Sequence, residues 1–274
     1  MDLIVQRYAK YRNHMEYQKG IVNTHKAIFL LGGHDLEMLE IRRMLSSHSL
    51  AYEDRNLNWS NARLSAYSDF INDHPHSCYY GIELMEDCQV PSHYVRIDHH
   101  NDFSNRPASI LQVAELLNVI PDRYLQLVAA NDAGYIPAML GVGADDDEVQ
   151  EIRRKDRAAQ GVTEQDELLA EKSIAEGLME LQSILIVHSY TARFSTICDR
   201  LYPYHRLLIY TDQEWTYYGA GKSELVATFN TDIRAGRVYH GGGQNGYIGA
   251  AKNAFSKEQI ESVVDQIKRE YEYI

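Results

Sequence analysis

The sequence has few cysteines. Its 274 residues include only Cys78, Cys88 and Cys198. They are odd in number and far apart, and no CxxC pair occurs. A disulfide framework needs paired cysteines, so a reduced compartment is the simplest interpretation of this usage.

Basic residues are also scarce. Lys and Arg number 27 against 39 Asp and Glu, which gives a formal net charge of −12. Coating a long nucleic acid requires clustered Lys and Arg to neutralise phosphates, so we do not expect that function. The charge does not exclude a small phosphorylated ligand, because a metal ion can supply positive charge locally.

Long apolar runs are missing as well. No run approaches the roughly 18 apolar residues of a membrane span, and the first 20 residues have no continuous apolar core. We therefore expect a cytoplasmic protein without a membrane partner. The composition that remains, 45% hydrophobic and 24% charged, is that of a globular chain with one large or two modest domains.

The first half of the chain alternates expected strands and helices. Strands are predicted at 26–31, 77–84 and 93–98. Helices are predicted over 1–25, over 36–48 with Met38, Ile41 and Leu45 on one face, from 107, and from 124. This alternation predicts an α/β fold with a doubly wound parallel sheet.

A charged stretch separates the two halves. Fifteen of the 28 residues from 145 to 172 are charged, ten of them acidic. We expect a solvated helical connector, broken near Gly161, and three parts: a catalytic domain over 1–145, the connector over 146–182, and a substrate-binding domain over 183–274.

The C-terminal part reads as a smaller α/β domain with a mixed sheet. Strands are predicted at 184–188, 206–211, 215–219 and 225–230, with "GAGKS" (219–223) as the turn of a hairpin. Ser256 and Gln259 form an S-x-x-Q capping box before a helix. The apolar face of that helix is formed by Ile260, Val263, Val264 and Ile267.

Acidic and imidazole side chains follow the expected strands of the first half, with one more at the end of a helix. They are Asp35, Glu37, Glu83, Asp98, His99, His100 and Asp132. Ligands of open parallel sheets bind beyond the carboxyl ends of the strands. Mixed oxygen and imidazole ligands suit Mn²⁺ or Mg²⁺, and two such ions can activate water and hold a phosphoryl oxygen. Taken singly, each residue could be a loop charge, and Asp35 could be a helix cap.

These residues also carry a family resemblance. "DHH" (98–100) followed by "RPASILQVAELL" resembles the signature of the DHH phosphoesterases. This family includes RecJ-type exonucleases, oligoribonucleases, phosphoadenosine-phosphate phosphatases, cyclic-dinucleotide phosphodiesterases, exopolyphosphatases and family II pyrophosphatases. "LGGHDLE" partly matches the first motif, H-x-x-P-D-x-D, with Leu31 in place of its histidine, and "NDAGYI" is similar to the D-T-G motif.

The resemblance implies a role for each residue. One or two Mn²⁺ ions, with Mg²⁺ as the alternative, would be bound by Asp35, Glu37, Glu83, His99 and Asp132. Glutamate stands in place of aspartate at two of these positions, Glu37 and Glu83. His100 would contact the phosphate, and Asp98 would orient the histidine pair.

A second motif lies near the C-terminus. "HGGGQNGYIGA" (240–250) is similar to the G-G-G-H-x-x-A-A-G loop of the family's accessory domain. The resemblance implies that Gly241, Gly242, Gly243 and Gln244 bind the substrate, since glycine backbone can present several N–H donors to an anion. A tight turn is the alternative interpretation.

Together these patterns predict a hydrolase. Its substrate would be a phosphoester or phosphoanhydride of a small nucleotide or short oligonucleotide, bound in a cleft between two domains. The altered first motif leaves a non-hydrolytic nucleotide-binding protein as an alternative, and an exopolyphosphatase- or pyrophosphatase-like activity as another. The sequence also allows a homodimer.

Overall fold

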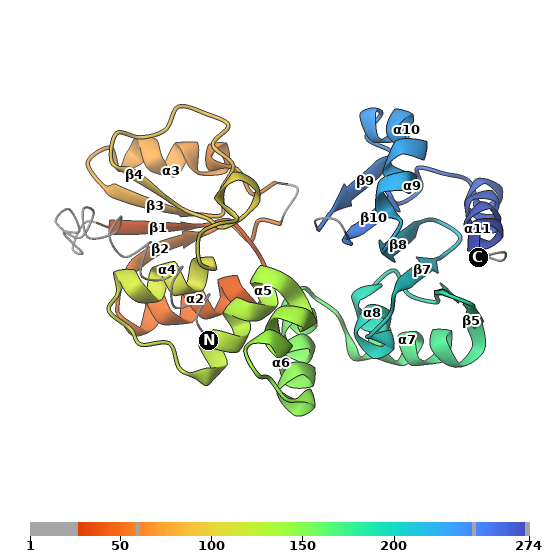
Figure 1. Ribbon diagram of the computed structural model, residues 1–274. Coiled ribbons are helices and arrows are strands. Elements are labelled where there is room, and N and C mark those ends of the chain that lie inside the picture. The colour runs from red at the N-terminus through yellow and green to blue at the C-terminus, as the bar shows by residue number, and fades with distance from the viewer. Residues whose placement is uncertain (1–26, 59–60, 243–244, 272–274) are drawn as a thin grey trace. The chain divides into compact units, whose positions relative to one another are not determined.

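Two β-sheets organise the chain in a computed structural model that describes residues 27–58, 61–242 and 245–271. By its contacts the chain divides into two compact units, 1–161 and 162–274, which Figure 1 shows. The helix predicted over 1–25 lies outside the described residues. No described helix has the length and apolar character needed to cross a membrane.

The sheet of the first unit has four parallel strands in the order β2-β1-β3-β4. The strands are β1 (Ala27–Leu31), β2 (Ala51–Asp54), β3 (Cys78–Ile82) and β4 (Tyr94–Ile97). The predicted parallel sheet is confirmed. The sequence did not predict β2, because this edge strand, AYED, is partly polar and has no buried residue.

Helices cover both faces of this sheet (Figure 1). They are α2 (Leu36–Ser47), α3 (Ser68–Asp73), α4 (Ser109–Leu116), α5 (Arg123–Gly141) and α6 (Asp146–Ala159), with 3₁₀ turns η2 (Leu64–Tyr67) and η3 (Asn101–Phe103). Helix α2 contacts α4, α5 and α6 on one side. On the other side, Leu30 and Tyr79 of the sheet pack with Leu64 and Tyr67.

The charged stretch forms two helices, α6 and α7 (Glu164–Gly177), each opened by a capping box. Helix α6 is not fully solvated: it contacts α2 and α5 and buries Val149 and Ile152. It therefore lies with the first unit, whereas α7 lies with the second. The predicted three-part division, with a connector of its own over 146–182, stays a prediction, because contacts alone do not test whether a segment folds independently.

The second unit has a six-stranded mixed sheet in the order β5-β6-β7-β8-β10-β9, in which β6 and β7 are parallel and the other pairs are antiparallel. The strands are β5 (Leu178–Leu181), β6 (Ile184–His188), β7 (Arg206–Tyr210), β8 (Trp215–Gly219), β9 (Val238–Gly241) and β10 (Tyr247–Ala250). Its helices, besides α7, are α8 (Ser195–Leu201), α9 (Lys222–Thr228), α10 (Asn230–Arg234) and α11 (Lys257–Tyr271). The predicted mixed sheet is confirmed.

The strand predicted at 225–230 is wrong. Gly219 and Gly221 have positive φ and turn the chain out of β8 into helix α9. Leu225 and Phe229, four residues apart, then bury on one side against Trp215 and its neighbours. A short apolar run does not by itself distinguish a strand from a buried helix, and the helical spacing decides here.

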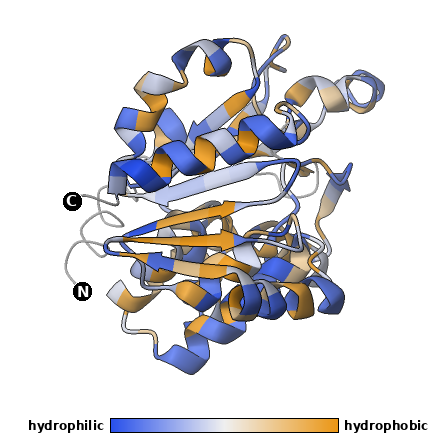
Figure 2. Ribbon diagram, turned by 90° about the vertical axis from the view of Figure 1, so that its right-hand side faces the viewer, coloured by the Kyte–Doolittle hydropathy of each residue, from blue (hydrophilic) through white to orange (hydrophobic). Residues whose placement is uncertain are grey.

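Helix α11 confirms its prediction. Gln259 Oε1 accepts from the Ser256 N–H, and Ser256 Oγ accepts from the Gln259 N–H, at 2.9 and 3.3 Å. The predicted apolar face is buried. In Figure 2 several strands are coloured mostly hydrophobic, whereas helices carry hydrophilic and hydrophobic residues side by side, as expected of amphipathic helices on a sheet.

A close backbone approach links β1 to β3 at the edge where the predicted ligands begin. A Cβ atom on Gly32 would lie 2.3 Å from the Ile82 carbonyl oxygen and 2.6 Å from that of Glu83. On Gly33 its nearest neighbour would be the flexible Met38 Cε, at 3.3 Å. Gly32→Ala should therefore lower the free energy of unfolding by about 1–3 kcal/mol, with Gly33→Ala changing it much less. Urea unfolding of both variants checks this, and equal losses would contradict it.

Candidate metal centre

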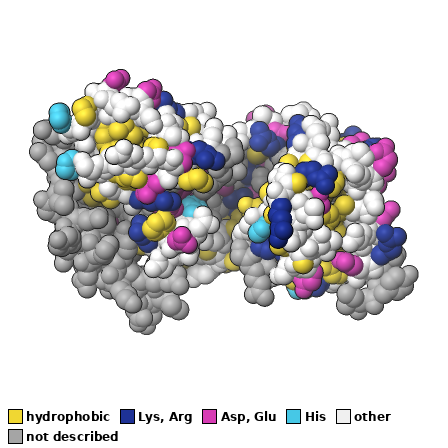
Figure 3. Space-filling model, turned by 90° about the horizontal axis from the view of Figure 1, so that it is seen from above, with side chains coloured by type: hydrophobic (Ala, Val, Ile, Leu, Met, Phe, Trp, Pro, Cys, Tyr) yellow, Lys and Arg dark blue, Asp and Glu magenta, His cyan; other side chains and the backbone are white. Residues whose placement is uncertain are grey.

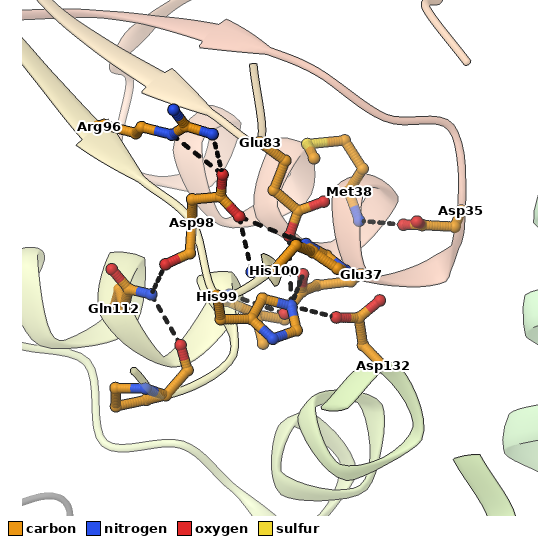
Figure 4. A network of polar contacts seen from close by, with 12 residues as sticks. Asp35, Glu37, Met38, Glu83, Arg96, Asp98, His99, His100, Gln112 and Asp132 are labelled. Atoms are coloured by element: carbon orange, nitrogen blue, oxygen red, sulfur yellow. Dashed lines mark hydrogen bonds and ion pairs between the residues drawn. The ribbon is translucent and has the colours of Figure 1, made fainter. Parts of the chain in front are cut away.

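The carboxyl ends of β1, β3 and β4 bring the predicted ligands to one edge of the first sheet. Asp35 and Glu37 lie at the start of α2, Glu83 follows β3, and the two histidines follow β4. Asp132 reaches the same place from α5. Figure 4 shows Glu37, Glu83 and Asp132 around the His99 and His100 rings, whereas Asp35 stands farther off with its carboxylate toward Met38. One ligand atom each from Glu83, His99, His100 and Asp132 lies within 4.8 Å of the others.

The His99 ring lies at the middle of this cluster. Its Nε2 is 2.5 Å from Asp132 Oδ2, 3.4 Å from Glu83 Oε1 and 3.8 Å from Glu37 Oε2. His100 Nδ1 lies 3.8 Å from the same Glu83 oxygen. Three carboxylates thus approach one imidazole nitrogen, and a second imidazole stands beside them.

Most atoms of the cluster are buried without a hydrogen bond among the described residues. They are Glu37 Oε2, both carboxylate oxygens of Glu83, His99 Nε2 and Asp132 Oδ2. Buried polar atoms are nearly always hydrogen-bonded, whereas these atoms have only the ion-pair contacts with His99 and His100 given above, so their convergence on one point needs an explanation. Four carboxylate oxygens and an imidazole nitrogen are the donor set of a divalent cation such as Mn²⁺ or Mg²⁺, and the residues fit such an ion.

The electrostatics of the cluster agree with this. Burial raises the pKa of Asp35 to about 8, and the Asp132 and Glu83 carboxylates add to the effect. Burial likewise raises the pKa of Glu37 and Asp132. Burial alone would lower the pKa of His99, but Asp132 and Glu83 raise it to about 10. Without a cation these raised pKa values favour the protonated carboxyl groups, and a bound cation would favour their ionised forms instead.

Backbone N–H groups orient two of the carboxylates. Asp35 Oδ1 accepts from the Met38 N–H at 2.9 Å, so Asp35 caps helix α2, as the alternative interpretation predicted. Glu37 Oε1 accepts from the Ile110 N–H at 2.9 Å, in the first turn of α4. One Glu37 oxygen is thereby held while the other, Oε2, faces His99. Glu83 itself has a positive φ of 54°, in the left-handed region that non-glycine residues adopt infrequently.

Asp98 lies behind the histidines and fixes their turn. Its Oδ1 accepts from the His100 backbone N–H at 2.8 Å, and its Oδ2 accepts from Arg96 Nη2 at 2.6 Å. Burial opposes ionisation, but these contacts and His100 outweigh it and lower the Asp98 pKa to about 2. The Gln112 amide also donates to the Asp98 carbonyl oxygen at 3.1 Å. This placement is compatible with the orienting role that the resemblance implies.

Helix α6 supplies residues that the sequence did not indicate. Asp156 Oδ1 accepts from the Leu36 N–H at 3.2 Å, next to Asp35. Arg153 Nη1 donates to Asp156 Oδ2 at 2.6 Å and to Asn131 Oδ1 at 2.9 Å, next to Asp132. The pair thus connects the two segments that carry Asp35 and Asp132. The buried i, i+3 charge pair was not recognised because the surrounding stretch is charged almost throughout.

The first-motif histidine has no replacement in the cluster. Leu31, at its position, is fully buried in the core. His34, three residues later, is not among the described residues whose ligand atoms converge. The centre is therefore built from the ends of β3 and β4, from Asp132, and from Glu37 of α2.

The predicted substrate-binding glycines lie in the second unit. Gly241 is the last residue of β9 and pairs with Tyr247, and Gly242 has a positive φ of 70° at the start of the turn. Gly243 and Gln244 lie outside the described residues. The described part of the motif thus lies on the paired antiparallel strands β9 and β10 and where they leave the sheet.

Known structures share this fold. A pGpG-specific phosphodiesterase, PggH from Vibrio cholerae, is 12% identical with a TM-score of 0.50, over 89% of this chain and 97% of that one. The DHH domain of a protein assigned to a family of ribosomal proteins is 11% identical with a TM-score of 0.60, over 100% and 93%. The chain has the fold of DHH-domain proteins. The family resemblance of the motifs is therefore confirmed at the level of the DHH fold.

Other comparisons are weaker. RecJ from Thermus thermophilus in complex with Mn²⁺ is 10% identical with a TM-score of 0.48, over 95% of this chain and 55% of that one. Neither a family model nor a curated protein matches the sequence. This chain is a divergent example of the DHH fold.

The cluster predicts different outcomes for its two histidines. His99→Ala removes the central nitrogen and should weaken Mn²⁺ binding by more than about tenfold, since even groups that only support metal ligands contribute that much. His100→Ala should keep most of the Mn²⁺ affinity, because its side chain is 31% exposed against 6% for His99. Titration calorimetry with Mn²⁺ measures both, with exposed His76→Ala as control. Equal Mn²⁺ affinity in His99→Ala and the wild-type protein would remove His99 from the centre.

Proposed function

We propose that the chain is a metal-dependent phosphohydrolase that cleaves a phosphoester or phosphoanhydride of a small nucleotide or short oligonucleotide. The observation that carries this proposal is the group of buried carboxylate and imidazole atoms that converge at the carboxyl edge of a parallel sheet with the DHH fold and have no hydrogen bonds outside the group. The structural neighbour PggH, which is a pGpG-specific phosphodiesterase, supports the same reaction class. A cytoplasmic location, a homodimer and a cleft between the domains stay predictions from the sequence.

Five residues would hold the metal. Glu83, His99 and Asp132 lie closest together, and Glu37 and Asp35 would complete the coordination of one or two Mn²⁺ or Mg²⁺ ions. When bound, such an ion supplies a Lewis acid toward a phosphoryl oxygen and a water molecule. Since a ligating imidazole must be neutral, His99 gives up a proton when the ion binds.

His100 is the best candidate for contact with the phosphate. It is less buried than His99. Burial would lower its pKa, but Asp98 and Glu83 raise it, which favours the protonated ring. A protonated imidazole can donate to a phosphoryl oxygen as negative charge develops there. Asp98, held by Arg96, keeps the ring in place through the His100 backbone.

The charge distribution favours a small substrate. On the face seen in Figure 3, acidic and basic side chains are interspersed over both units. Long nucleic acid is bound by clustered cations, whereas one or two phosphates need only a local site.

A hydrolysis screen, with products separated by chromatography, tests the function, because cleavage of a phosphodiester gives a nucleotide rather than free phosphate. The substrates are linear dinucleotides, cyclic dinucleotides, phosphoadenosine phosphate, pyrophosphate and polyphosphate. We expect Mn²⁺-dependent hydrolysis of a nucleotide substrate that chelation removes and added Mn²⁺ restores. Glu83→Gln, which removes a charge from the centre, should lose this activity, and His76→Ala should keep it. No product from any substrate at millimolar Mn²⁺, or product that forms equally in the chelator, would refute the proposal.

The hairpin glycines would contact the substrate phosphate through the backbone, and Gly242 tests this. Gly242→Ala should cost about 1 kcal/mol of stability, because φ is positive, and should also raise KM with a smaller effect on kcat. Gly236 has the same φ of 70° in the same unit and open space around it, whereas a Cβ on Gly242 would lie 3.0 Å from Gly246 Cα, so Gly236→Ala should cost somewhat less stability and leave KM unchanged. Steady-state kinetics and thermal melting of both variants decide. A normal KM in Gly242→Ala would show that the hairpin serves as a turn only.

A further inference from the structure

Three tyrosines line one face of the second sheet beside the glycine hairpin. In the register of β8, β10 and β9, Tyr247 stands opposite both Tyr218 and Gly241, and Tyr239 stands opposite Gly249. Residues directly opposite each other in an antiparallel pair project from the same face. Tyr218, Tyr239 and Tyr247 therefore share one face, together with the two glycines.

The other face of these strands is the core. Trp215, Tyr217, Val238 and Ile248, which alternate with the tyrosines and glycines, are buried with residues of α9 and α11. On the tyrosine face, the buried cluster under α7 and α8 draws on β6 and β7, and Tyr218 packs at its margin. On β9 and β10, toward the edge of the sheet, the tyrosine side chains are exposed to solvent: Tyr239 is 43% exposed and Tyr247 is 38% exposed.

The glycines give the rings room to lie across the sheet. A Cβ on Gly241 would be 2.6 Å from the Tyr247 hydroxyl oxygen, and one on Gly249 would be 2.9 Å from that of Tyr239. The Tyr239 hydroxyl is also 3.2 Å from Thr216 Oγ1, within hydrogen-bond distance. The Tyr247 ring is 6.1 Å from the Tyr239 ring and 6.4 Å from the Tyr218 ring. The Tyr247 and Tyr239 rings thus lie over Gly241 and Gly249, and neighbouring tyrosine rings lie beside them.

We infer that Tyr239 and Tyr247 form a stacking surface for a nucleobase of the substrate. The inference rests on the proposed function and specifies its substrate class: a nucleotide rather than pyrophosphate or polyphosphate. Exposed aromatic rings that are already held in place stack on a base of any sequence with little loss of side-chain entropy. The rings adjoin the Gly241–Gly242 turn, and Lys222 Nζ donates to the Gly241 carbonyl oxygen at 3.0 Å, which places positive charge near that turn. A base could stack on the rings while its phosphate meets the backbone of the adjoining Gly241–Gly242 segment.

Binding without catalysis tests the inference. The full chain is titrated into a fluorescently labelled linear diguanosine dinucleotide in EDTA, and anisotropy gives Kd. Tyr239→Ala and Tyr247→Ala should each weaken binding by about 5- to 100-fold, the loss expected for one stacked base. Tyr239→Phe and Tyr247→Phe keep the ring and should stay within about twofold, given that stacking needs no hydroxyl.

Two controls separate a stacking surface from a structural role. Tyr190, which is 45% exposed beside His188, lies in the same unit outside the tyrosine face, so Tyr190→Ala should bind as the wild-type protein does. Binding of inorganic pyrophosphate, measured by calorimetry, should be equal in the Tyr→Ala variants and the wild-type protein. If the Ala variants melt early, the Phe variants still report: loss of dinucleotide binding in both folded Phe variants would overturn the role of the rings.

The remaining outcomes also decide. Undiminished dinucleotide binding by folded Tyr→Ala variants would overturn the inference even if the protein hydrolyses phosphoesters. So would failure of the wild-type protein to bind millimolar dinucleotide. A change in oligomeric state in the Ala variants, with dinucleotide binding unchanged, would assign the face to a second copy of the chain. Conversely, ring-dependent dinucleotide binding without any hydrolysis would support the stacking surface and refute the proposed enzyme.

Discussion

The burial of several carboxylates around one imidazole is the constraint on which the first unit depends. Desolvation and mutual repulsion make this arrangement unfavourable, which is why the pKa values of Asp35, Glu37 and Asp132 are raised. Protons or a cation must relieve it. A metal ion that binds only the folded chain would also stabilise the folded state, so metal binding and the stability of this unit are linked.

The scaffold holds these charges by using the starts of helices. Asp35 and Asp156 accept from backbone N–H groups in the first turn of α2, and Glu37 accepts from the first turn of α4. Helix N-termini favour negative charge, because their N–H groups lack partners within the helix. Asp35 and Glu37 are therefore each fixed by a backbone N–H through one oxygen. For Glu37 the second oxygen remains directed at the cluster.

Sequence patterns predicted the apolar elements and missed the polar ones. Strands β1, β3 and β4 are buried or half-buried runs that end in ligands, so both the parallel sheet and the edge with Glu83 and His99 could be expected. Strand β2 and the Arg153–Asp156 pair could not, because their residues are polar and only the tertiary structure shows what they contact. The prediction for α9 was wrong for a different reason. Its apolar run suits a strand as well as a helix, and the turn at Gly219 and Gly221 is not evident from the pattern.

The glycine motif shows how one pattern can serve two physical purposes. The family resemblance assigns its glycines to phosphate binding, but the strand register assigns Gly241 and Gly249 to the tyrosines across from them. Gly242, with its positive φ, belongs to the turn. The two interpretations overlap at Gly241, whereas Gly242 concerns the phosphate alone and Gly249 the tyrosines alone. Under the proposals made above, the first unit supplies the metal chemistry, which any phosphoester could undergo. The second unit, with a turn for phosphate and rings for a base, supplies the selection that the metal cannot.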